Sequence, residues 1–269
     1  MTNLVLAGCG KMGGALLAGW LDRGLDPTAV WAVEPNAEAV AWAKARGVGV
    51  VASPDEIPQT FSPDVVMLAV KPQMMDAVVP AYMGFAQGSS VFLSIAAGKT
   101  IGYFESLLGT GAPIVRSMPN TPAAVRRGMT VACANALVSA PAKTLCGELL
   151  EAVGEVAWID DEALMDPVTA VSGSGPAYIF LLAECLAQAG IDAGLPADLA
   201  ARLARATVAG AGELLHQADE TPATLRQNVT SPGGTTAEAL AVLMGEDGWQ
   251  PVLTKAVAAA CKRSRELAG

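Results

Sequence analysis

The stretch Leu4-Val5-Leu6-Ala7-Gly8-Cys9-Gly10-Lys11-Met12-Gly13 decides the fold of this chain. Its four apolar residues predict a buried strand, and the GxGxxG pattern that follows predicts a tight turn opening directly into a helix. The first glycine makes the turn, the second lets a pyrophosphate approach the backbone, and the third allows close helix–strand packing. A glycine-rich turn without a cofactor is the alternative, but the strand–helix units that follow favour dinucleotide binding.

Short β-rich runs alternate with helical patterns over about the first 160 residues, which implies βαβ units and a parallel sheet with helices on both faces. From about Asp161 the β pattern gives way to alanine- and leucine-rich segments at helical spacing. We therefore predict an α/β chain with an N-terminal dinucleotide-binding domain at 1–160 and an all-α domain at 161–269. The predicted strands are 4–7, 30–33, 48–51, 65–70, 91–94 and 113–115, and the predicted C-terminal helices are 178–189, 197–215, 237–244 and 252–267.

The composition predicts a substantial core, because 52% of the 269 residues are hydrophobic and 16% are charged. A net charge of −9 argues against nucleic acid or an anionic membrane as a partner. The longest uncharged run, 77–98, contains Pro80 and Gly84, which predicts a turn rather than a membrane span. The apolar N-terminal stretch is cut by Gly8 and Lys11, so we expect no signal peptide and a cytoplasmic location.

The five cysteines are an odd number and include no CxxC pair. This predicts small buried hydrophobic residues in a reducing compartment, with neither a disulfide framework nor a metal site. They are Cys9, Cys133, Cys146, Cys185 and Cys261.

Glu34 ends the second predicted strand, about 20 residues beyond the glycine pattern. An acidic side chain there accepts a hydrogen bond from the ribose 2′-hydroxyl of NAD. The neighbouring Pro35-Asn36-Ala37 offers no arginine for a 2′-phosphate. Alternatively, Glu34 points to solvent, and Asn36 with the amides of the next turn accepts the phosphate of NADP. The residues favour NADH and leave the preference open.

A second glycine turn opens a helix near the C-terminus, at Ser231-Pro232-Gly233-Gly234-Thr235-Thr236-Ala237-Glu238. Thr235, three residues before Glu238, predicts a capping box. The first amides of such a helix lack intrahelical partners and attract a carboxylate or a phosphate. This segment alone allows two interpretations, an ordinary capped loop or an anion site with a hydroxyl beside it.

Three more loops follow apolar strands, at the edge where a doubly wound sheet binds its ligand: Ala69-Val70-Lys71-Pro72-Gln73, Ser94-Ile95-Ala96-Ala97-Gly98 and Met118-Pro119-Asn120-Thr121-Pro122. With the two glycine turns and Val171-Ser172-Gly173-Ser174-Gly175-Pro176-Ala177-Tyr178, they form an ordered set along the chain. The chain thereby resembles pyrroline-5-carboxylate reductase over essentially its full length. The resemblance implies reduction of a cyclic imino acid, 1-pyrroline-5-carboxylate, to L-proline, the last step of proline biosynthesis. The cofactor is NADPH or NADH, and family usage favours NADPH whereas Glu34 favours NADH. It also implies that 1–160 is a Rossmann domain and that 161–269 is a helical dimerisation and substrate domain. The helices of that domain are expected to form a homodimer, and dimers are expected to assemble into a larger ring such as a decamer.

The resemblance also assigns site residues. Those expected at the cofactor are Ala7, Gly8, Cys9, Gly10, Lys11, Met12, Gly13, Glu34, Asn36, Ala69, Val70, Lys71, Pro72, Ser94, Ala96, Ala97 and, from the helical domain, Asn228. Those expected at the substrate are Asp219, Ser231, Gly234, Thr235 and Thr236. Thr236 is expected as the catalytic residue at the ring nitrogen, and Asp219 falls where many relatives have a glutamate. No metal is expected.

The chemistry needs a hydride from the cofactor and a proton on the imine nitrogen. A threonine hydroxyl is a poor acid, so we expect Thr236 to orient the nitrogen while the proton arrives with an iminium substrate or through water. The single histidine, His216, is predicted to be a solvated surface residue. Lys71 precedes Pro72 at a strand end, which favours a structural role in the loop near the cofactor.

Two alternatives remain at this level. The β-hydroxyacid dehydrogenases share a Rossmann domain followed by helices, but they carry a lysine where this chain has Ile179, and isoleucine cannot transfer a proton. A non-catalytic dinucleotide-binding module would explain the first glycine turn but not the anion site with its hydroxyl.

Overall fold

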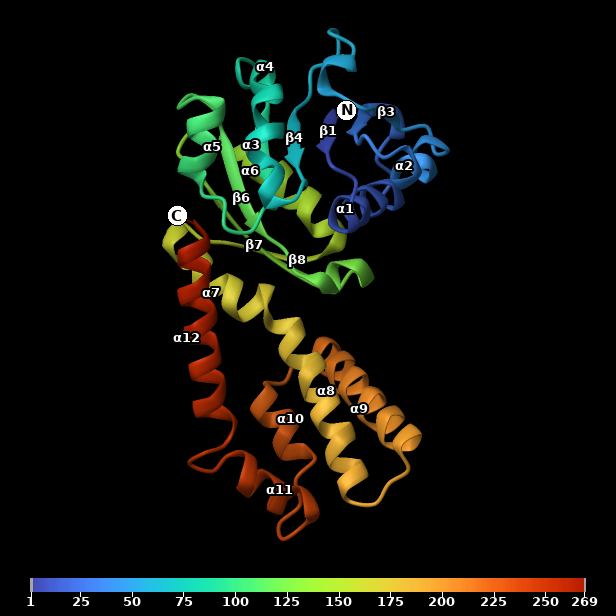
Figure 1. The fold of residues 1–269 in the computed structure, drawn as a ribbon, viewed down its shortest axis with the longest axis vertical. Coiled ribbons are helices and arrows are strands. Elements are labelled where there is room, and N and C mark those ends of the chain that lie inside the picture. Colours follow the sequence, from blue (N-terminus) through green and yellow to red (C-terminus); the bar gives the residue numbers. More distant parts are fainter. Residues whose placement is uncertain (1, 269) are drawn as a thin grey trace. The chain divides into compact units, whose positions relative to one another are not determined.

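The computed structural model describes residues 2–268 (Figure 1). Contacts within the chain divide it into two compact units. We call Met1–Gly173 together with Cys261–Gly269 the sheet unit, and Ser174–Ala260 the helical unit. The last strand ends at Trp158, so the predicted change from strands to helices near residue 160 is confirmed. A domain boundary between residues 160 and 161 stays a prediction.

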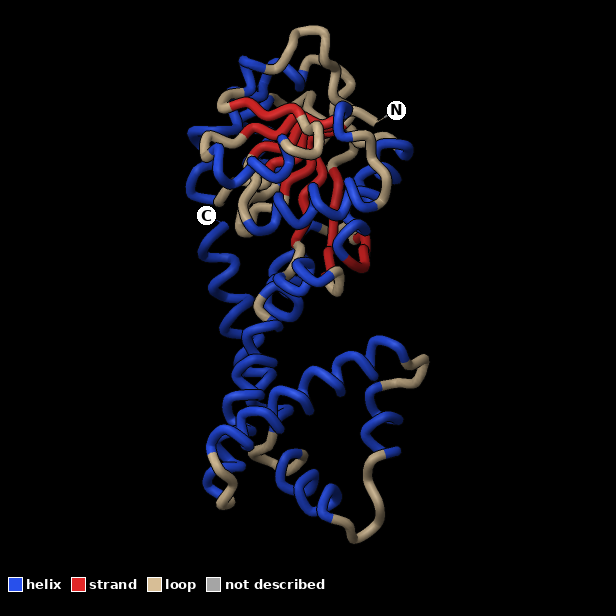
Figure 2. Tube along the Cα trace, turned by 90° about the vertical axis from the view of Figure 1, so that its right-hand side faces the viewer, coloured by secondary structure: helices blue, strands red, loops and turns tan. Residues whose placement is uncertain are grey.

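The sheet unit contains an eight-stranded sheet in the order β3-β2-β1-β4-β5-β6-β7-β8. Its strands are drawn in red in Figure 2. The strands are β1 (Leu4–Ala7), β2 (Val30–Val33), β3 (Gly49–Val51), β4 (Val65–Leu68), β5 (Val91–Ser94), β6 (Ile114–Met118), β7 (Gly128–Ala134) and β8 (Gly154–Trp158). Neighbouring strands pair in parallel, except that β6 and β7 are antiparallel. The order of the first six strands is that of a doubly wound dinucleotide-binding fold, which confirms the predicted fold class.

The sequence does not predict β7 and β8. Gly128, Ala132 and Ala134 dilute the β-branched residues of β7, so its local pattern is weak. The strand is stabilised instead by pairing with β6 on one side and β8 on the other. The prediction also extends β4 two residues too far, because β4 ends at Leu68.

Helices cover both faces of the sheet. The α-helices of this unit are α1 (Lys11–Asp22), α2 (Ala37–Lys44), α3 (Met75–Val78), α4 (Met83–Ala86), α5 (Ile101–Leu108), α6 (Ala140–Leu150) and α7 (Met165–Val168). Side chains of α1, α2 and α6 form one core cluster with Leu4 and Leu6 of β1. Side chains of α3, α5 and α7 form the other, with Val5 and Ala7. Alternate residues of β1 thus face opposite cores, which is why the whole strand is apolar.

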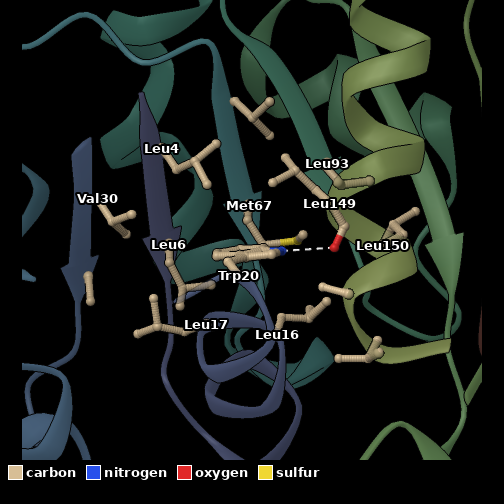
Figure 3. Packing of buried hydrophobic residues seen from close by; sticks show 14 of the residues in the cluster. Leu4, Leu6, Leu16, Leu17, Trp20, Val30, Met67, Leu93, Leu149 and Leu150 are labelled. Atoms are coloured by element: carbon tan, nitrogen blue, oxygen red, sulfur yellow. Dashed lines mark hydrogen bonds between the residues drawn. The ribbon is translucent and has the colours of Figure 1, made fainter. Parts of the chain in front are cut away.

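Trp20 lies at the centre of the first cluster, among leucines of α1 and α6 (Figure 3). Its indole Nε1 donates a hydrogen bond to the carbonyl oxygen of Leu149 at 2.8 Å. The one polar atom of this buried ring is therefore paired, and the bond ties α1 to the end of α6.

The helical unit has almost no core of its own. It contains α8 (Gly175–Asp192), α9 (Ala197–Gln217), α10 (Pro222–Asn228), α11 (Thr235–Leu243) and most of α12 (Trp249–Ala268), whose last turns belong to the sheet unit. Its buried apolar residues are two alanines of α9, Ala200 and Ala204. Large apolar side chains such as Phe180 and Leu181 are exposed. The sequence predicts these helices except the short α10.

Candidate active site

The glycine turn between β1 and α1 has the shape that a pyrophosphate needs. Gly8 has a φ of +90°, a conformation that favours glycine. A Cβ on Gly13 would overlap the carbonyl oxygen of Gly8, so glycine lets α1 begin this close to the strand. Around Gly10, by contrast, no atom beyond its own and those of its two chain neighbours lies within 4 Å of the place of a Cβ. Packing within the chain therefore explains the first and third glycines, and an approaching ligand explains the second.

The N-terminus of α1 is open to an anion. Its N-cap, Gly10, has no capping side chain, and the first turn carries no acidic residue. Within the part of the chain that the structure describes, the amides of Lys11 and Met12 have no hydrogen-bond acceptor. Unpaired amides at the positive end of a helix dipole attract phosphate. The residues present therefore fit the pyrophosphate of a dinucleotide.

Glu34 lies at the end of β2, with its carboxylate fixed by two backbone amides. The N–H of Cys9 donates to Oε2 at 2.9 Å, and the N–H of Asn36 donates to Oε1 at 3.0 Å. The side-chain oxygen of Asn36 accepts from the N–H of Glu38 at 3.1 Å and so caps α2. Burial, and then the charge of Glu34, raise the pKa of the Cys9 thiol to about 11, so this thiol is neutral at pH 7.

A cavity of about 350 Å³ opens beside Glu34. Its wall includes Gly8, Lys71 and Tyr82, and it lies at the carboxyl ends of β1, β2 and β4. The volume is in the range of small-molecule pockets. Lys71 is exposed and is the N-cap of the 3-10 turn Pro72–Met74. Its position in this wall is consistent with the predicted structural role near the cofactor.

The loop after β5 lies beside the loop after β4. Leu68 and Ser94, the last residues of the two strands, are paired in register, so Ala69 and the loop after Ser94 leave the sheet at the same edge. Ser94 Oγ accepts from the N–H of Ala96 at 3.2 Å. The carbonyl oxygen of Ser94 accepts from the hydroxyl of Ser117 on β6 at 2.9 Å. The structure thus brings together the two loops that the sequence assigns to the cofactor.

Sequence reasoning did not single out Asn120 and Arg116. Asn120 Oδ1 accepts from the N–H of Met129 at 2.9 Å, and its Nδ2 donates to the carbonyl oxygen of Ser172 at 3.2 Å. Arg116, 5% exposed, donates to Glu162 Oε1 at 2.7 Å. These partners lie far apart in the sequence, so spacing gives no sign of them. The available signals were the position of Asn120 in the loop after a predicted strand and a charged residue, Arg116, directly after the apolar run 113–115.

The second glycine turn begins α11, and the predicted capping box is wrong. Gly234 is the N-cap, with φ −84° and ψ 170°, and no side chain caps the helix. Thr235 is already the first helical residue, one position too late for its hydroxyl to act as a cap. The turn is made by Gly233, with φ +68°, and by the N–H of Gly234, which donates to the carbonyl oxygen of Ser231 at 3.0 Å.

Without a cap, the start of α11 has the features of an anion site. Among the described residues, no acceptor faces the amides of Thr235 and Thr236. The side chains of Ser231 and Thr235 are exposed, and Thr236 is half-buried. Hydroxyl groups and unpaired amides on one turn favour the anion-site interpretation over the capped loop.

Three other residues named from the sequence lie at the surface of the helical unit. Asp219 and Asn228 are exposed, the latter at the end of α10. His216, in the last turn of α9, is exposed as predicted. Burial of Cys9, Cys133 and Cys146 is also confirmed.

The prediction of buried cysteines is wrong for Cys185, which α8 exposes because the helical unit has little core to cover it. Cys261 is partly exposed. In residues 2–268, no group of three or more His, Cys, Asp or Glu side chains is placed to hold a metal ion.

The sheet order, the glycine turn onto an open helix terminus and the acidic residue at the end of β2 define a nicotinamide-dinucleotide oxidoreductase of the Rossmann type. In agreement, the family model described as NADP oxidoreductase, coenzyme F420-dependent, matches residues 3–98. The model described as pyrroline-5-carboxylate reductase dimerisation matches residues 162–267.

Whole-chain comparisons name the family. A pyrroline-5-carboxylate reductase of Pseudomonas aeruginosa is 41% identical over 269 residues, 99% of this chain and 97% of that protein. The structure of a pyrroline-5-carboxylate reductase from Coxiella burnetii has a TM-score of 0.93 at 34% identity, covering 100% of this chain and 99% of that one. A Plasmodium falciparum pyrroline carboxylate reductase with NADP bound has a TM-score of 0.81 at 30% identity, covering 100% and 98%. The chain belongs to the pyrroline-5-carboxylate reductase family, which confirms the resemblance carried by its motifs.

Proposed function

We propose that this chain reduces 1-pyrroline-5-carboxylate to L-proline with a hydride from NAD(P)H, the last step of proline biosynthesis. The observation that carries the proposal is the uncapped start of α11, where Ser231, Thr235 and Thr236 bring hydroxyl groups beside two unpaired amides. A cyclic imino acid presents a carboxylate to such amides and a ring nitrogen to a neighbouring hydroxyl. The family relation over 99% of the chain supports the same reaction.

On the substrate side, the amides of α11 with Ser231 and Gly234 hold the carboxylate, and the hydroxyl of Thr236 holds the ring nitrogen. The bound nicotinamide supplies the hydride. The C=N carbon gains that hydride, the π electrons move to nitrogen, and nitrogen gains a proton. Thr236 orients the nitrogen without supplying the proton, which comes with an iminium substrate or through water. Asp219 is assigned to the same side.

On the cofactor side, the turn Ala7–Gly13 holds the phosphates. The loops Ala69–Pro72 and Ser94–Ala97 line the ribose and the nicotinamide, and Asn228 contributes from the helical unit of a second copy. The open space at Gly10 and the free amides after it support the first assignment. The pairing of Leu68 with Ser94 supports the second, because both loops start from neighbouring strand ends.

The cofactor is assigned as NADH in preference to NADPH. The carboxylate of Glu34 is fixed by two amides at the edge of the cavity, where it can accept from a ribose 2′-hydroxyl. A 2′-phosphate at that place would meet a like charge. The side-chain oxygen of Asn36, the alternative phosphate-binding residue, is used to cap α2.

The helical unit is assigned to self-association in a homodimer, with further assembly into a decamer. One helical stretch, Glu162–Asp192, has the length and apolar composition of a membrane-spanning helix, and little of its most apolar part is buried in the single chain. The stretch falls in the region that matches a dimerisation domain. We therefore assign its apolar surface to contact with a second copy of the chain rather than with lipid. With a net charge of −9, the chain is expected to bind no nucleic acid and no anionic membrane. Its five cysteines, an odd number without a CxxC pair, favour a reducing compartment, so the chain is expected in the cytoplasm.

The test measures oxidation of NADH or NADPH by the purified enzyme. Two substrates are compared, 1-pyrroline-5-carboxylate and a β-keto acid. Turnover is expected with the imino acid alone. Thr236→Ala is expected to lower kcat/KM, while Thr236→Ser, which keeps the hydroxyl, retains most of it. Turnover of the β-keto acid would assign the chain to dehydrogenase chemistry. Tight cofactor binding with no turnover of either would indicate a sensing module. If Thr236→Ala keeps the wild-type kcat/KM, Thr236 has no role in the reaction.

A further inference from the structure

The C-terminal end of α12 packs against the turn that follows β5. Gly98, in this turn, has a φ of +73°. The carbonyl oxygen and Cβ of Leu267 lie 3.5 and 3.6 Å from the place of a Cβ on Gly98. The last turn of α12 therefore packs against Gly98, the final residue of the loop Ser94–Gly98, although the side chain of Leu267 itself is exposed. This loop consists of small residues and one isoleucine, so its shape depends on such outside contacts.

Asp166, on α7, forms a hydrogen bond to this end of α12 within the sheet unit. The hydroxyl of Ser264, a residue only 6% exposed, donates to Asp166 Oδ1 at 2.6 Å. Arg265 Nε lies 3.7 Å from Asp166 Oδ2, but its side chain is 67% exposed and adds little. A short bond from a buried hydroxyl to a carboxylate is among the stronger hydrogen bonds in proteins. The Ser264–Asp166 bond is therefore the main fastening.

The same short segment also holds the other end of the turn. Glu162 Oε1 accepts from the N–H of Ile101 at 2.9 Å and from Arg116 Nη1 at 2.7 Å. Ile101 is the first residue of α5, so the Glu162 carboxylate lies at the positive end of that helix. Residues 162–166 thus contact the start of α5 directly and, through Ser264, hold the helix that covers Gly98.

We propose that Asp166 is a positioning residue for hydride transfer. By holding Ser264, it keeps Leu267 against Gly98 and so fixes the loop Ser94–Gly98, on which the nicotinamide is proposed to lie. This inference rests on the proposed function. It adds a residue remote from the substrate whose loss acts on the geometry of the reaction rather than on cofactor affinity.

The experiment compares Asp166→Ala with the wild type in two measurements. The first is kcat and its deuterium isotope effect, with NADH deuterated at the transferred position. Since small misplacements of reacting groups are costly, kcat per active site should fall roughly ten-fold or more, and the isotope effect should rise as hydride transfer becomes rate-limiting. KM for NADH should change little, because Glu34 and the glycine turn are untouched. The second is amide hydrogen exchange without cofactor, where a peptide covering 95–101 should exchange faster.

Matched variants separate the loss of the Ser264–Asp166 hydrogen bond from a general loss of stability. Ser264→Ala should reproduce both effects, and adding it to Asp166→Ala should cost little more, because the two residues act as one unit. Asp166→Asn keeps an oxygen that accepts from Ser264 and should restore most of kcat. Arg265→Gln should behave as wild type. If Asp166→Ala does not fold, Ser264→Ala decides by the same two measurements.

A variant with a lower Tm but wild-type kcat, isotope effect and loop exchange would show a purely structural role and overturn the inference. A wild-type enzyme without turnover would instead overturn the proposed function. In that case the exchange of peptide 95–101 still reports whether Asp166 holds the loop, so the two failures can be told apart.

Discussion

The amide of Cys9 donates a hydrogen bond to the carboxylate of Glu34 at 2.9 Å, which joins the cofactor turn to the end of β2. The two residues lie 25 positions apart, and the contact forms within the chain itself. The acidic group therefore has a fixed place before a cofactor binds, and preorganisation of this kind reduces the cost of binding.

Replacing Glu34 by alanine should change the cofactor preference. Loss of the proposed hydrogen bond to the ribose 2′-hydroxyl should lower kcat/KM for NADH about ten-fold or more, since bonds to charged groups contribute about 1.5–3 kcal/mol. Removal of the negative charge should leave kcat/KM for NADPH unchanged or higher. Steady-state kinetics with both cofactors give the ratio. Glu38→Ala, on the exposed first turn of α2, is the control. Equal losses with both cofactors would contradict the role of Glu34.

Gly10→Ala should separate folding from cofactor binding. No protein atom lies near the added methyl group, so the Tm should stay within about 2 °C of wild type, as for a substitution without a clash. The methyl group would stand where the pyrophosphate approaches, so the Kd for NADH should rise at least about ten-fold. Calorimetry and fluorescence titration measure the two effects. Gly13→Ala, unlike Gly10→Ala, should lower the Tm as well, because its methyl group meets the Gly8 carbonyl. Unchanged affinity in Gly10→Ala would argue against the assigned phosphate site.

Burial raises the pKa of the Cys146 thiol to about 12, from 9.0 for an exposed thiol. The unfolded chain therefore loses this proton at lower pH than the folded chain. The contribution to stability is present below about pH 9 and is lost as the pH rises toward 12. Between pH 9 and 11, the Tm of Cys146→Ala should fall less steeply than that of the wild type. Cys185→Ala, at an exposed cysteine, should follow the wild type. Parallel curves for all three proteins would show that Cys146 does not contribute to the alkaline transition.

Phe180→Glu should dissociate the proposed dimer. Phe180 is 63% exposed in the single chain and lies on α8 beside other large apolar residues. A charge buried at an interface without a partner is strongly destabilising, so sedimentation should shift toward the monomer. Leu137→Glu is the control, because this leucine is 49% exposed on the sheet unit. An unchanged sedimentation coefficient for Phe180→Glu would place the contact surface elsewhere.

The fold could be predicted largely from local patterns. The first strand, the glycine turn and the following helix are contiguous, and their residue types leave few alternatives. β7 could not be predicted in the same way, because its small residues are held by long-range pairing with Met118 and Trp158 on the strands beside it. The sequence also predicted the wrong N-cap for α11. Nothing in the letters distinguishes Gly234 in an extended conformation from Thr235 in that position.

The site shows the same division. The turns that offer amides are local, and the sequence finds them. The contacts that hold those turns are not local: Glu34 reaches Cys9 across 25 residues, and Asn120 reaches Ser172 across 52. Such pairs depend on which strand ends meet in space, and a single sequence carries no record of that.

The hydrogen bond between Ser264 and Asp166 joins residues 98 positions apart, so it can form only late in translation. A ribosome makes the loop after β5 early, yet the helix turn that covers it emerges only after the whole helical unit. During translation the nascent sheet unit therefore lacks the contact of α12 with Gly98 until the C-terminal residues have been made. The part of the molecule proposed to meet the nicotinamide is among the last to be completed, so a truncated chain lacking residue 264 would have an incomplete loop even with every cofactor-binding residue present.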